Sequence, residues 1–331
     1  MSKQWTVDDL MRLATGYQAA CVVFAGAELD VFGALTARPM SAAALANDVR
    51  SDPRATAVLL DALVALGLLV KDGAEYAPAP GVADVLTETG SHTMLAMVRH
   101  QANCLRRWVR LPEIAKTGKL PEREPSILGA AADTASFIGA MDNVSRSMAA
   151  ELIAEVRPLE FRHLLDVGGA SGTWTIAFLR AVPGATATIF DLPDVIPIAR
   201  RRIAEAGMAD RVRLVGGDFC RDDLPAGADL AWLGAIIHQN SREQNRALFA
   251  KVLAALAPGG TVVIRDIVMD ESRTVPAAGA LFAINMLCGT PGGGTFSFRE
   301  ISEDLCAAGF DDVELLRRGQ AMDSLVRARK K

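Results

Sequence analysis

The chain has 331 residues, of which 50% are hydrophobic and 22% charged, and its formal net charge at pH 7 is -4. This length favours two domains, and the composition is typical of a globular protein with a sizeable core. The acidic balance lacks the excess of lysine and arginine that drives binding to a polyanion, so we expect no nucleic-acid partner.

The cysteines and the apolar runs bear on the cellular compartment. The five cysteines form no C-x-x-C pair and have no nearby histidines at metal-ligand spacing, which favours reduced thiols and argues against a bound metal. The longest uninterrupted apolar run, residues 62–70, is too short to cross a bilayer, and residues 1–18 are polar where a signal peptide is apolar. We therefore expect a cytoplasmic protein without a membrane partner.

Helical periodicity dominates residues 10–150, apart from a short hairpin expected at residues 68–77. Residues 40–80 combine two helices and this hairpin in the order of a winged helix. The second helix, residues 54–66, would be the one to enter a DNA groove, but its only charges are one arginine and one aspartate. Because phosphate contacts need more cations, we expect this helix to lie in a subunit interface.

From residue 162 onward, apolar strand-like runs alternate with helical segments, which predicts a parallel sheet with crossover helices. Capping boxes at Ser241 and Ser297 mark the starts of two of these helices. We place the domain boundary near residue 150, with a helical domain over 1–150 and an α/β domain over 151–331. The strands are expected at 163–167, 187–190, 212–215, 229–233, 261–267, 313–316 and 324–328.

The most informative motif runs from His163 to Gly172, where an apolar strand with an acid near its end leads into a glycine turn and a helix. Gly168 and Gly169 have no Cβ, so a ligand can lie against bare backbone at the carboxyl edge of the sheet. The turn lacks the G-x-G-x-x-G spacing of a dinucleotide loop, and Asp166 would repel a phosphate. A ligand with a cationic amino and sulfonium end fits this carboxylate, and S-adenosylmethionine is the common cofactor of that kind.

Two further strand ends offer carboxylates at the same edge. Asp191, followed by Leu192, ends the second strand, where a carboxylate can accept both hydroxyls of a ribose. The third strand runs into Gly217, Asp218 and Phe219, which offer an acceptor for the adenine amino group and a ring to stack on the base. Acids at three successive strand ends predict a single cofactor site.

His238 follows the fourth strand and is expected at the same edge of the sheet. Because an imidazole titrates near neutral pH, it can remove the proton from a hydroxyl acceptor. Asp266 ends the fifth strand next door and could orient the imidazole through Nδ1. Asp266 could equally pair with Arg265 or another arginine, since adjacency in a sheet is not contact.

Taken together, these motifs resemble the two-domain class I S-adenosylmethionine-dependent O-methyltransferases, which include caffeate, hydroxyindole and bacterial polyketide O-methyltransferases. The resemblance implies a Rossmann-like seven-stranded methyltransferase sheet with an N-terminal, mainly helical, winged-helix-like dimerisation domain that forms a homodimer and helps to close the substrate pocket. It also implies methyl transfer from S-adenosyl-L-methionine to a hydroxyl of an aromatic or polyketide-like small molecule, with S-adenosyl-L-homocysteine as product. The likeness rests on segments 165–169, 190–193, 217–219, 237–238, 258–260 and 308–310, in family order.

Carried over position by position, the resemblance places the general base at His238 and the acid that orients it at Asp266. The chain departs from the family at three places. Gln239-Asn240 follow the histidine where Asp-Trp is frequent, and Thr295 stands where plant members have a second acid. Gly234, which we include among the cofactor-binding positions, takes the place of a lysine.

In such enzymes the last helices of the first domain and the insertion after the fifth strand line the substrate pocket. Flat, apolar acceptors suit the aromatic and methionine side chains of these segments. At helical spacing the same residues are equally consistent with core packing. The candidates are Trp108, Phe137, Met141, Asn285 and Met286.

Two other functions stay open at this point. A family member can bind the cofactor without transferring its methyl group, as a decarboxylase or hydroxylase, and the altered residues after His238 are compatible with that. A ligand-responsive winged-helix transcription regulator is the alternative of another class, which the apolar helix 54–66 argues against. The acceptor atom, whether oxygen, nitrogen or carbon, also stays open.

Overall fold

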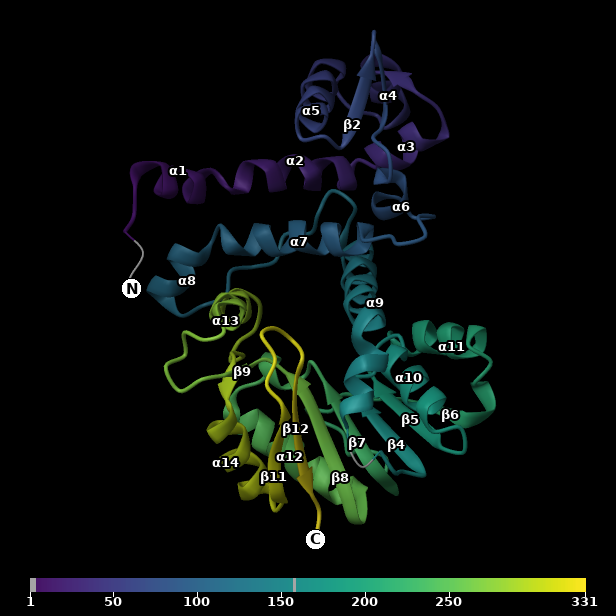
Figure 1. The fold of residues 1–331 in the computed structure, drawn as a ribbon, viewed down its shortest axis with the longest axis vertical. Helices are drawn as coiled ribbons and strands as arrows, with labels where there is room; N and C mark the ends of the chain where they lie inside the picture. The colour runs from purple at the N-terminus through teal and green to yellow at the C-terminus, as the bar shows by residue number, and fades with distance from the viewer. Residues whose placement is uncertain (1–3, 157–158) are drawn as a thin grey trace. The chain divides into compact units, whose positions relative to one another are not determined.

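The computed structural model describes residues 4–156 and 159–331, and Figure 1 labels its elements. The chain forms two compact units, one made of the residues up to Arg106 together with 123–143, and the other of residues 107–122 and 144–331. Helix α9 (Ala130–Glu155) runs without a break past residue 150, where the sequence analysis places the domain boundary. The chain passes from the first unit to the second inside this helix, between Asn143 and Val144.

The first unit is mainly helical and carries a small antiparallel sheet in the order β1-β3-β2. The hairpin expected at residues 68–77 is present, and the two helices before it match the predicted winged-helix order. The helices are α1 (Val7–Thr15), α2 (Tyr17–Glu28), α3 (Val31–Ala37), α4 (Ala42–Asp48), α5 (Pro53–Ala65), α6 (Val82–Leu86) and most of α7 (Leu95–Trp108); the strands are β1 (Met40–Ser41), β2 (Leu69–Asp72) and β3 (Glu75–Pro78).

Helix α5 shows how the winged-helix part is held together. It begins at Pro53, and the Asp52 side chain caps it by accepting from the Ala55 backbone. One face of the helix is buried in the core of the unit through Leu60 and Leu63. Part of its apolar surface stays exposed, since 62% of Val58 is accessible to solvent.

The second unit is built on a seven-stranded sheet in the order β11-β12-β8-β7-β4-β5-β6. All seven expected strands are present. The sheet is parallel, as predicted, except at one edge, where β12 runs antiparallel to both β8 and β11. Residues 318–323 contain no helix, so the chain has no crossover and returns in the opposite direction. The strands are β4 (His163–Val167), β5 (Thr186–Asp191), β6 (Val212–Gly216), β7 (Ala228–Gly234), β8 (Leu256–Asp266), β11 (Asp311–Arg317) and β12 (Ser324–Arg329).

Helices cover both faces of this sheet, and each face has its own hydrophobic core (Figure 1). The end of α9, α10 (Thr173–Ala181) and α11 (Ile196–Glu205) pack on one face. Helices α12 (Arg242–Ala255) and α14 (Phe298–Ala308) pack on the other, and both begin with the capping boxes predicted at Ser241 and Ser297. The remaining elements are α8 (Leu111–Thr117), α13 (Ala277–Gly289), β9 (Val268–Met269), β10 (Phe296–Ser297) and the 3-10 helices η1 (Ala209–Arg211) and η2 (Ile237–Gln239).

Within the described part of the chain, no single helix is long and apolar enough to cross a membrane. The bent pair formed by Val7–Glu28 and Val31–Ala37 passes that test by length and composition alone.

Candidate active site

The glycine turn between β4 and α10 leaves no room for a side chain at Gly168 or Gly169. Gly168 has a φ of 69°, and a Cβ there would stand 2.3 Å from Cδ1 of Ile236. The N–H of Gly168 donates to the carbonyl of Phe190 at 2.8 Å, which ties the turn to the neighbouring strand. A Cβ on Gly169 would stand 2.9 Å from the carboxyl carbon of Asp166. The turn therefore lies directly over this acid and exposes backbone at the carboxyl edge of the sheet.

Asp166 is a buried acid at the end of β4. Its side chain is 1% exposed, and Oγ1 of Thr175 donates to Oδ2 at 2.6 Å. Burial raises the pKa of Asp166 to about 7, and repulsion from Asp191 adds to the shift, while the hydrogen bonds from Thr175 oppose it. An ammonium or sulfonium group would stabilise such a carboxylate. Thr175 was not predicted from the sequence, where its only signal is its place in the first turn of the helix after the glycines.

Asp191 lies beside the same turn, at the end of β5. Its Oδ2 accepts the N–H of Ala170 and its Oδ1 accepts the N–H of Leu192, both at 2.7 Å. Burial raises the pKa of Asp191, although these two backbone hydrogen bonds counteract the shift. Each carboxylate oxygen accepts one hydrogen bond here and so keeps a lone pair for a further donor, such as a ribose hydroxyl.

The third strand end forms a tight loop after β6. The N–H of Gly217 donates to the carbonyl of Asp191 at 2.9 Å, which joins the second and third strand ends. Oδ1 of Asp218 accepts the N–H of Cys220 at 2.9 Å, and Nε of Arg221 lies 3.6 Å from Oδ2. The local bonds of Asp218 therefore fix the orientation of its carboxylate.

Lys251, on α12, holds this loop through two hydrogen bonds. Its Nζ donates to the carbonyls of Phe219 and Asp222 at 3.0 and 2.9 Å, while the Phe219 ring packs against the core of that face. Lys251 was not predicted from the sequence, because a lysine inside a helix gives no signal of a contact with a loop about 30 residues earlier.

His238 and Asp266 are brought into contact. His238 lies in η2, directly after β7, and its Nδ1 is 3.0 Å from both carboxylate oxygens of Asp266. The side chains are 12% and 1% exposed, and the N–H of Ile267 donates to Oδ1 of Asp266 at 2.8 Å. In the tautomer whose Nδ1–H donates a hydrogen bond to Asp266, Nε2 has the lone pair that can accept a proton from a substrate.

Arg265 does not share the side of the strand on which Asp266 lies, because successive residues of β8 point to opposite faces. Its guanidinium lies over the Trp174 ring, 4.8 Å from the ring centre, and Nη2 is 3.2 Å from Sδ of Met148. Burial lowers the pKa of Arg265 to about 10, although nearby Asp266 and Asp323 oppose that shift.

The candidate substrate residues fall in both units. In the second unit, Nε1 of Trp108 donates to Oδ1 of Asn285 at 3.0 Å, which brings two candidates together, and neighbouring Met286 is 8% exposed. Phe137 and Met141 belong to the first unit. The Phe137 ring is 48% exposed and lies 5.3 Å from the ring of His100.

Gly234 and Thr295 both lie in closely packed surroundings. A Cβ on Gly234 would stand 2.4 Å from Nε1 of Trp232, so the indole occupies the space that a longer side chain would need. Thr295 is 5% exposed, and its carbonyl accepts a hydrogen bond from Nη1 of Arg273 at 2.8 Å. Among the described residues, no group of three or more His, Cys, Asp and Glu side chains is placed to hold a metal ion.

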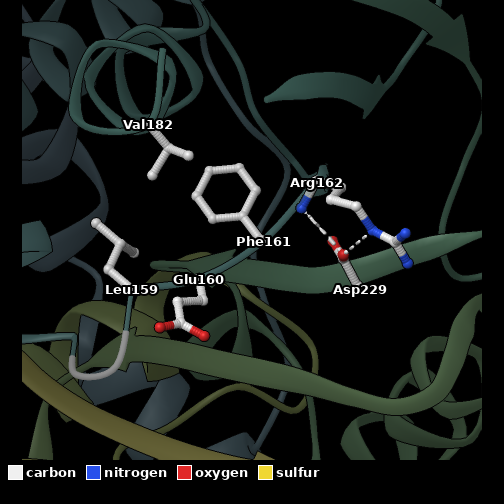
Figure 2. A pocket seen from close by; sticks show the side chains of 6 residues that line it. All are labelled: Leu159, Glu160, Phe161, Arg162, Val182 and Asp229. Carbon is white, nitrogen blue, oxygen red and sulfur yellow. Dashed lines mark hydrogen bonds and ion pairs between the residues drawn. The ribbon is translucent and has the colours of Figure 1, made fainter. Parts of the chain in front are cut away.

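Figure 2 shows an open pocket at the start of β4, with a volume of about 440 Å³. It lies at the amino ends of β4 and β7, whereas the glycine turn and His238 follow the carboxyl ends of the same strands. Its acid, Asp229, accepts hydrogen bonds from the backbone N–H groups of Arg162 and His163. This acid therefore has a structural role in holding the first residues of β4.

Comparison with known proteins identifies the family. Residues 127–311 match the O-methyltransferase domain and residues 11–89 match the O-methyltransferase dimerisation domain. The chain is 32% identical over 315 residues to the tetracenomycin polyketide synthesis 8-O-methyl transferase TcmO of Streptomyces glaucescens, covering 92% of this chain and 91% of that protein. It is 32% identical over 320 residues to the 3-hydroxy-5-methyl-1-naphthoate 3-O-methyltransferase of Streptomyces sahachiroi, covering 93% and 90%.

A solved structure agrees with these matches. The crystal structure of human N-acetylserotonin methyltransferase in complex with S-adenosylmethionine superimposes with a TM-score of 0.82 at 26% identity, covering 100% of this chain and 99% of that one. The chain therefore belongs to the two-domain O-methyltransferase family and is an S-adenosylmethionine-dependent O-methyltransferase.

Proposed function

We propose that the protein methylates a hydroxyl group of an aromatic or polyketide-like small molecule, with His238 as the general base. The observation that carries this proposal is the contact between His238 and Asp266 at the sheet edge where the glycine turn also lies. Two relatives named for a polyketide and a naphthoate O-methyltransferase support an aromatic acceptor.

The residues of the sheet edge fit S-adenosylmethionine by charge and hydrogen-bonding capacity. When bound, this cofactor supplies a methyl group already activated on a sulfonium, so the protein has to orient the acceptor and remove its proton. Asp166, whose buried carboxylate is repelled by a neighbouring acid, would pair with the cationic amino-acid end. Asp191, with lone pairs remaining, would hold the ribose, and Asp218 and Phe219 would hold the adenine.

In the proposed reaction, Nε2 of His238 takes the proton of the acceptor hydroxyl. Asp266 accepts a hydrogen bond from Nδ1–H, which keeps the ring in the required tautomer and stabilises the imidazolium that forms when Nε2 is protonated. The deprotonated oxygen is the nucleophile that receives the methyl group. Because Asp266 is buried and held by a backbone N–H, its negative charge has a fixed position beside the ring.

The acceptor would lie against Trp108, Asn285 and Met286 of the second unit. The hydrogen bond between Trp108 and Asn285 fixes the plane of the indole, and a fixed aromatic surface suits a flat ring system.

A homodimer formed through the N-terminal domain is the proposed assembly. Helix α1 and its flanks expose an unusual set of large apolar side chains in a single protomer, which a partner subunit would cover. The most exposed are Trp5 (59%), Val7 (78%), Leu10 (58%), Leu13 (69%) and Tyr17 (56%).

The direct test is the release of S-adenosylhomocysteine when the protein is supplied with S-adenosylmethionine and a panel of phenols, naphthols and hydroxylated polyketide-like compounds. We expect at least one acceptor to gain one methyl group in place of its hydroxyl hydrogen for each molecule of S-adenosylhomocysteine released. The matched methyl ethers, which lack that hydroxyl, should not react. Intact cofactor binding without product from any acceptor would favour a decarboxylase or hydroxylase that does not transfer the methyl group.

A further inference from the structure

The turn that carries His238 is intrinsically weak. Helix η2 has three residues, and 3-10 turns have poorer hydrogen-bond geometry than α-helices. Its own backbone bonds are long, at 3.2 Å from the N–H of Gln239 to the carbonyl of Ile236 and 3.3 Å from the N–H of Asn240 to the carbonyl of Ile237. Other groups must therefore hold the backbone from which the imidazole extends.

Two buried amides hold the inner side of this turn. Nδ2 of Asn245 donates to the carbonyl of Ile237 at 2.9 Å, and Nδ2 of Asn240 donates to Oδ1 of Asn245 at 3.1 Å. The two side chains are 2% and 5% exposed, so water cannot replace a lost partner without rearrangement. Asn245 lies in the first turn of α12, whose start is fixed by the capping box of Ser241. The amide pair therefore ties the histidine turn to the end of a rigid helix.

A glycine loop holds the outer side. The N–H of Gly294 donates to the carbonyl of His238 itself at 2.8 Å. A Cβ on Gly293 would stand 2.4 Å from that carbonyl oxygen and 2.4 Å from Oγ1 of Thr290. Since Oγ1 of Thr290 accepts the N–H of Gly293 at 2.9 Å and donates to the carbonyl of Met286 at 2.9 Å, the loop is fastened to α13.

We propose that Asn240 and Asn245 are positioning residues for His238, which hold η2 against the glycine loop so that Nδ1 stays on the Asp266 carboxylate. Asn240 ends this turn and supplies a buried hydrogen bond to Asn245. The effect on catalysis rests on the proposed role of His238 as base, whereas the effect on the contact between Nδ1 and Asp266 does not.

Three variants test the amide pair. Asn245→Asp keeps the acceptor for Asn240 and loses the donor to Ile237, and Asn240→Ala removes the amide that donates to Asn245. Gln239→Ala is the matched control, because Gln239 belongs to the same turn and its side chain is exposed. We expect kcat for a phenol or naphthol that the wild type methylates to fall about 10- to 100-fold in the first two variants. KM and the Kd for S-adenosylhomocysteine should stay within about twofold.

The second readout needs no acceptor. Selective ¹⁵N labelling of the four histidines reports which imidazole nitrogen carries the proton. We expect the signal of protonated Nδ1 of His238, assigned by its absence in His238→Ala, to weaken or split into two tautomers in Asn245→Asp and Asn240→Ala. It should be unchanged in Gln239→Ala. Thermal melting identifies any variant that does not fold, in which case Asn240→Ser takes its place.

The outcomes separate this inference from the proposed function. Wild-type kcat and an unaltered Nδ1 signal in both amide variants would overturn the positioning role. If His238→Ala keeps wild-type turnover, the role of His238 as base is lost, and the Nδ1 signal alone then decides whether the amides position the ring. A loss of kcat in Gln239→Ala as large as in the amide variants would also contradict the proposal, because the effect would then belong to the whole turn.

Discussion

At the scale of single residues, two buried acids of this site, Asp166 and Asp266, differ in the groups that surround them. Asp266 is buried but faces an imidazole, and Asp166 is buried with a second acid nearby. Asp266 therefore has a basic partner within the protein, whereas Asp166 would be stabilised by a cationic ligand. The two acids should therefore respond differently to substitution.

Cofactor affinity should depend on pH through Asp166. With its pKa raised to about 7 by burial, the free protein holds this carboxyl protonated at pH 6 and ionised at pH 8. A cationic ligand requires the ionised form, so the proton must leave when the ligand binds at low pH. We expect the Kd for S-adenosylhomocysteine, measured by calorimetry, to rise about tenfold from pH 8 to pH 6.

The matched control for that titration is Asp166→Asn, whose amide can still accept the hydrogen bond from Thr175 but cannot ionise. Its affinity should be weaker at pH 8 and nearly independent of pH. A wild-type Kd that stays constant between pH 6 and pH 8 would contradict the assignment of Asp166 to the cationic end of the cofactor.

At the scale of elements, the sequence predicted what local patterns determine. The seven strands and both capping boxes follow from apolar runs and from serine with an acid or amide three residues later. The antiparallel direction of β12 was not predicted. It follows from the short connection between β11 and β12, which contains no crossover helix. Thr175, Asn245 and Lys251 were missed, because their partners lie in other elements and polar residues inside helices carry no distinctive spacing.

The packing of α12 against α14 depends on a charged cluster around Asp304. Its carboxylate is 5% exposed and receives hydrogen bonds from Nε and Nη2 of Arg242 and from Nη1 of Arg246, all at 2.9 Å. Arg242→Met should lower the free energy of unfolding by about 1–3 kcal/mol, because a buried acid loses two of its donors. Urea denaturation measures this.

Arg201 provides the comparison for Arg242. Its guanidinium is 70% exposed and lies 3.9 Å from Glu205, so Arg201→Met should change the free energy of unfolding by less than about 0.5 kcal/mol. Equal losses in the two variants would show that Asp304 does not depend on Arg242.

At the scale of the whole molecule, the switch from helical to strand periodicity indicates a boundary near residue 150, whereas the compact units divide between Asn143 and Val144. Helix α9 spans it, because one continuous helical pattern can pass from one core to another. A sequence shows where periodicity continues, whereas the division between cores depends on which residues of that helix are buried against each unit.

The dimer proposal predicts the effect of charges on α1. Leu10 and Leu13 are one turn apart on the same helix and are 58% and 69% exposed. The wild type should behave as a dimer in light scattering coupled to size exclusion. Leu10→Asp with Leu13→Asp should shift it to monomer, because covering two carboxylates with a partner subunit is costly.

Ile127→Asp is the control for surface charge, since Ile127 is 70% exposed and lies outside α1. This variant should remain a dimer. A monomeric wild type, or a double variant that still dimerises with unchanged affinity, would contradict the assignment of α1 to the interface.

The most direct test of the central claim is the turnover of His238→Ala with an acceptor that the wild type methylates, measured as release of S-adenosylhomocysteine at saturating cofactor. We expect a loss of about 100- to 10,000-fold in kcat, because a positioned base is removed. The Kd for S-adenosylhomocysteine should stay within about twofold, since His238 is assigned to the acceptor. Turnover within about threefold of wild type would contradict the account, because the hydroxyl would then be methylated without this base.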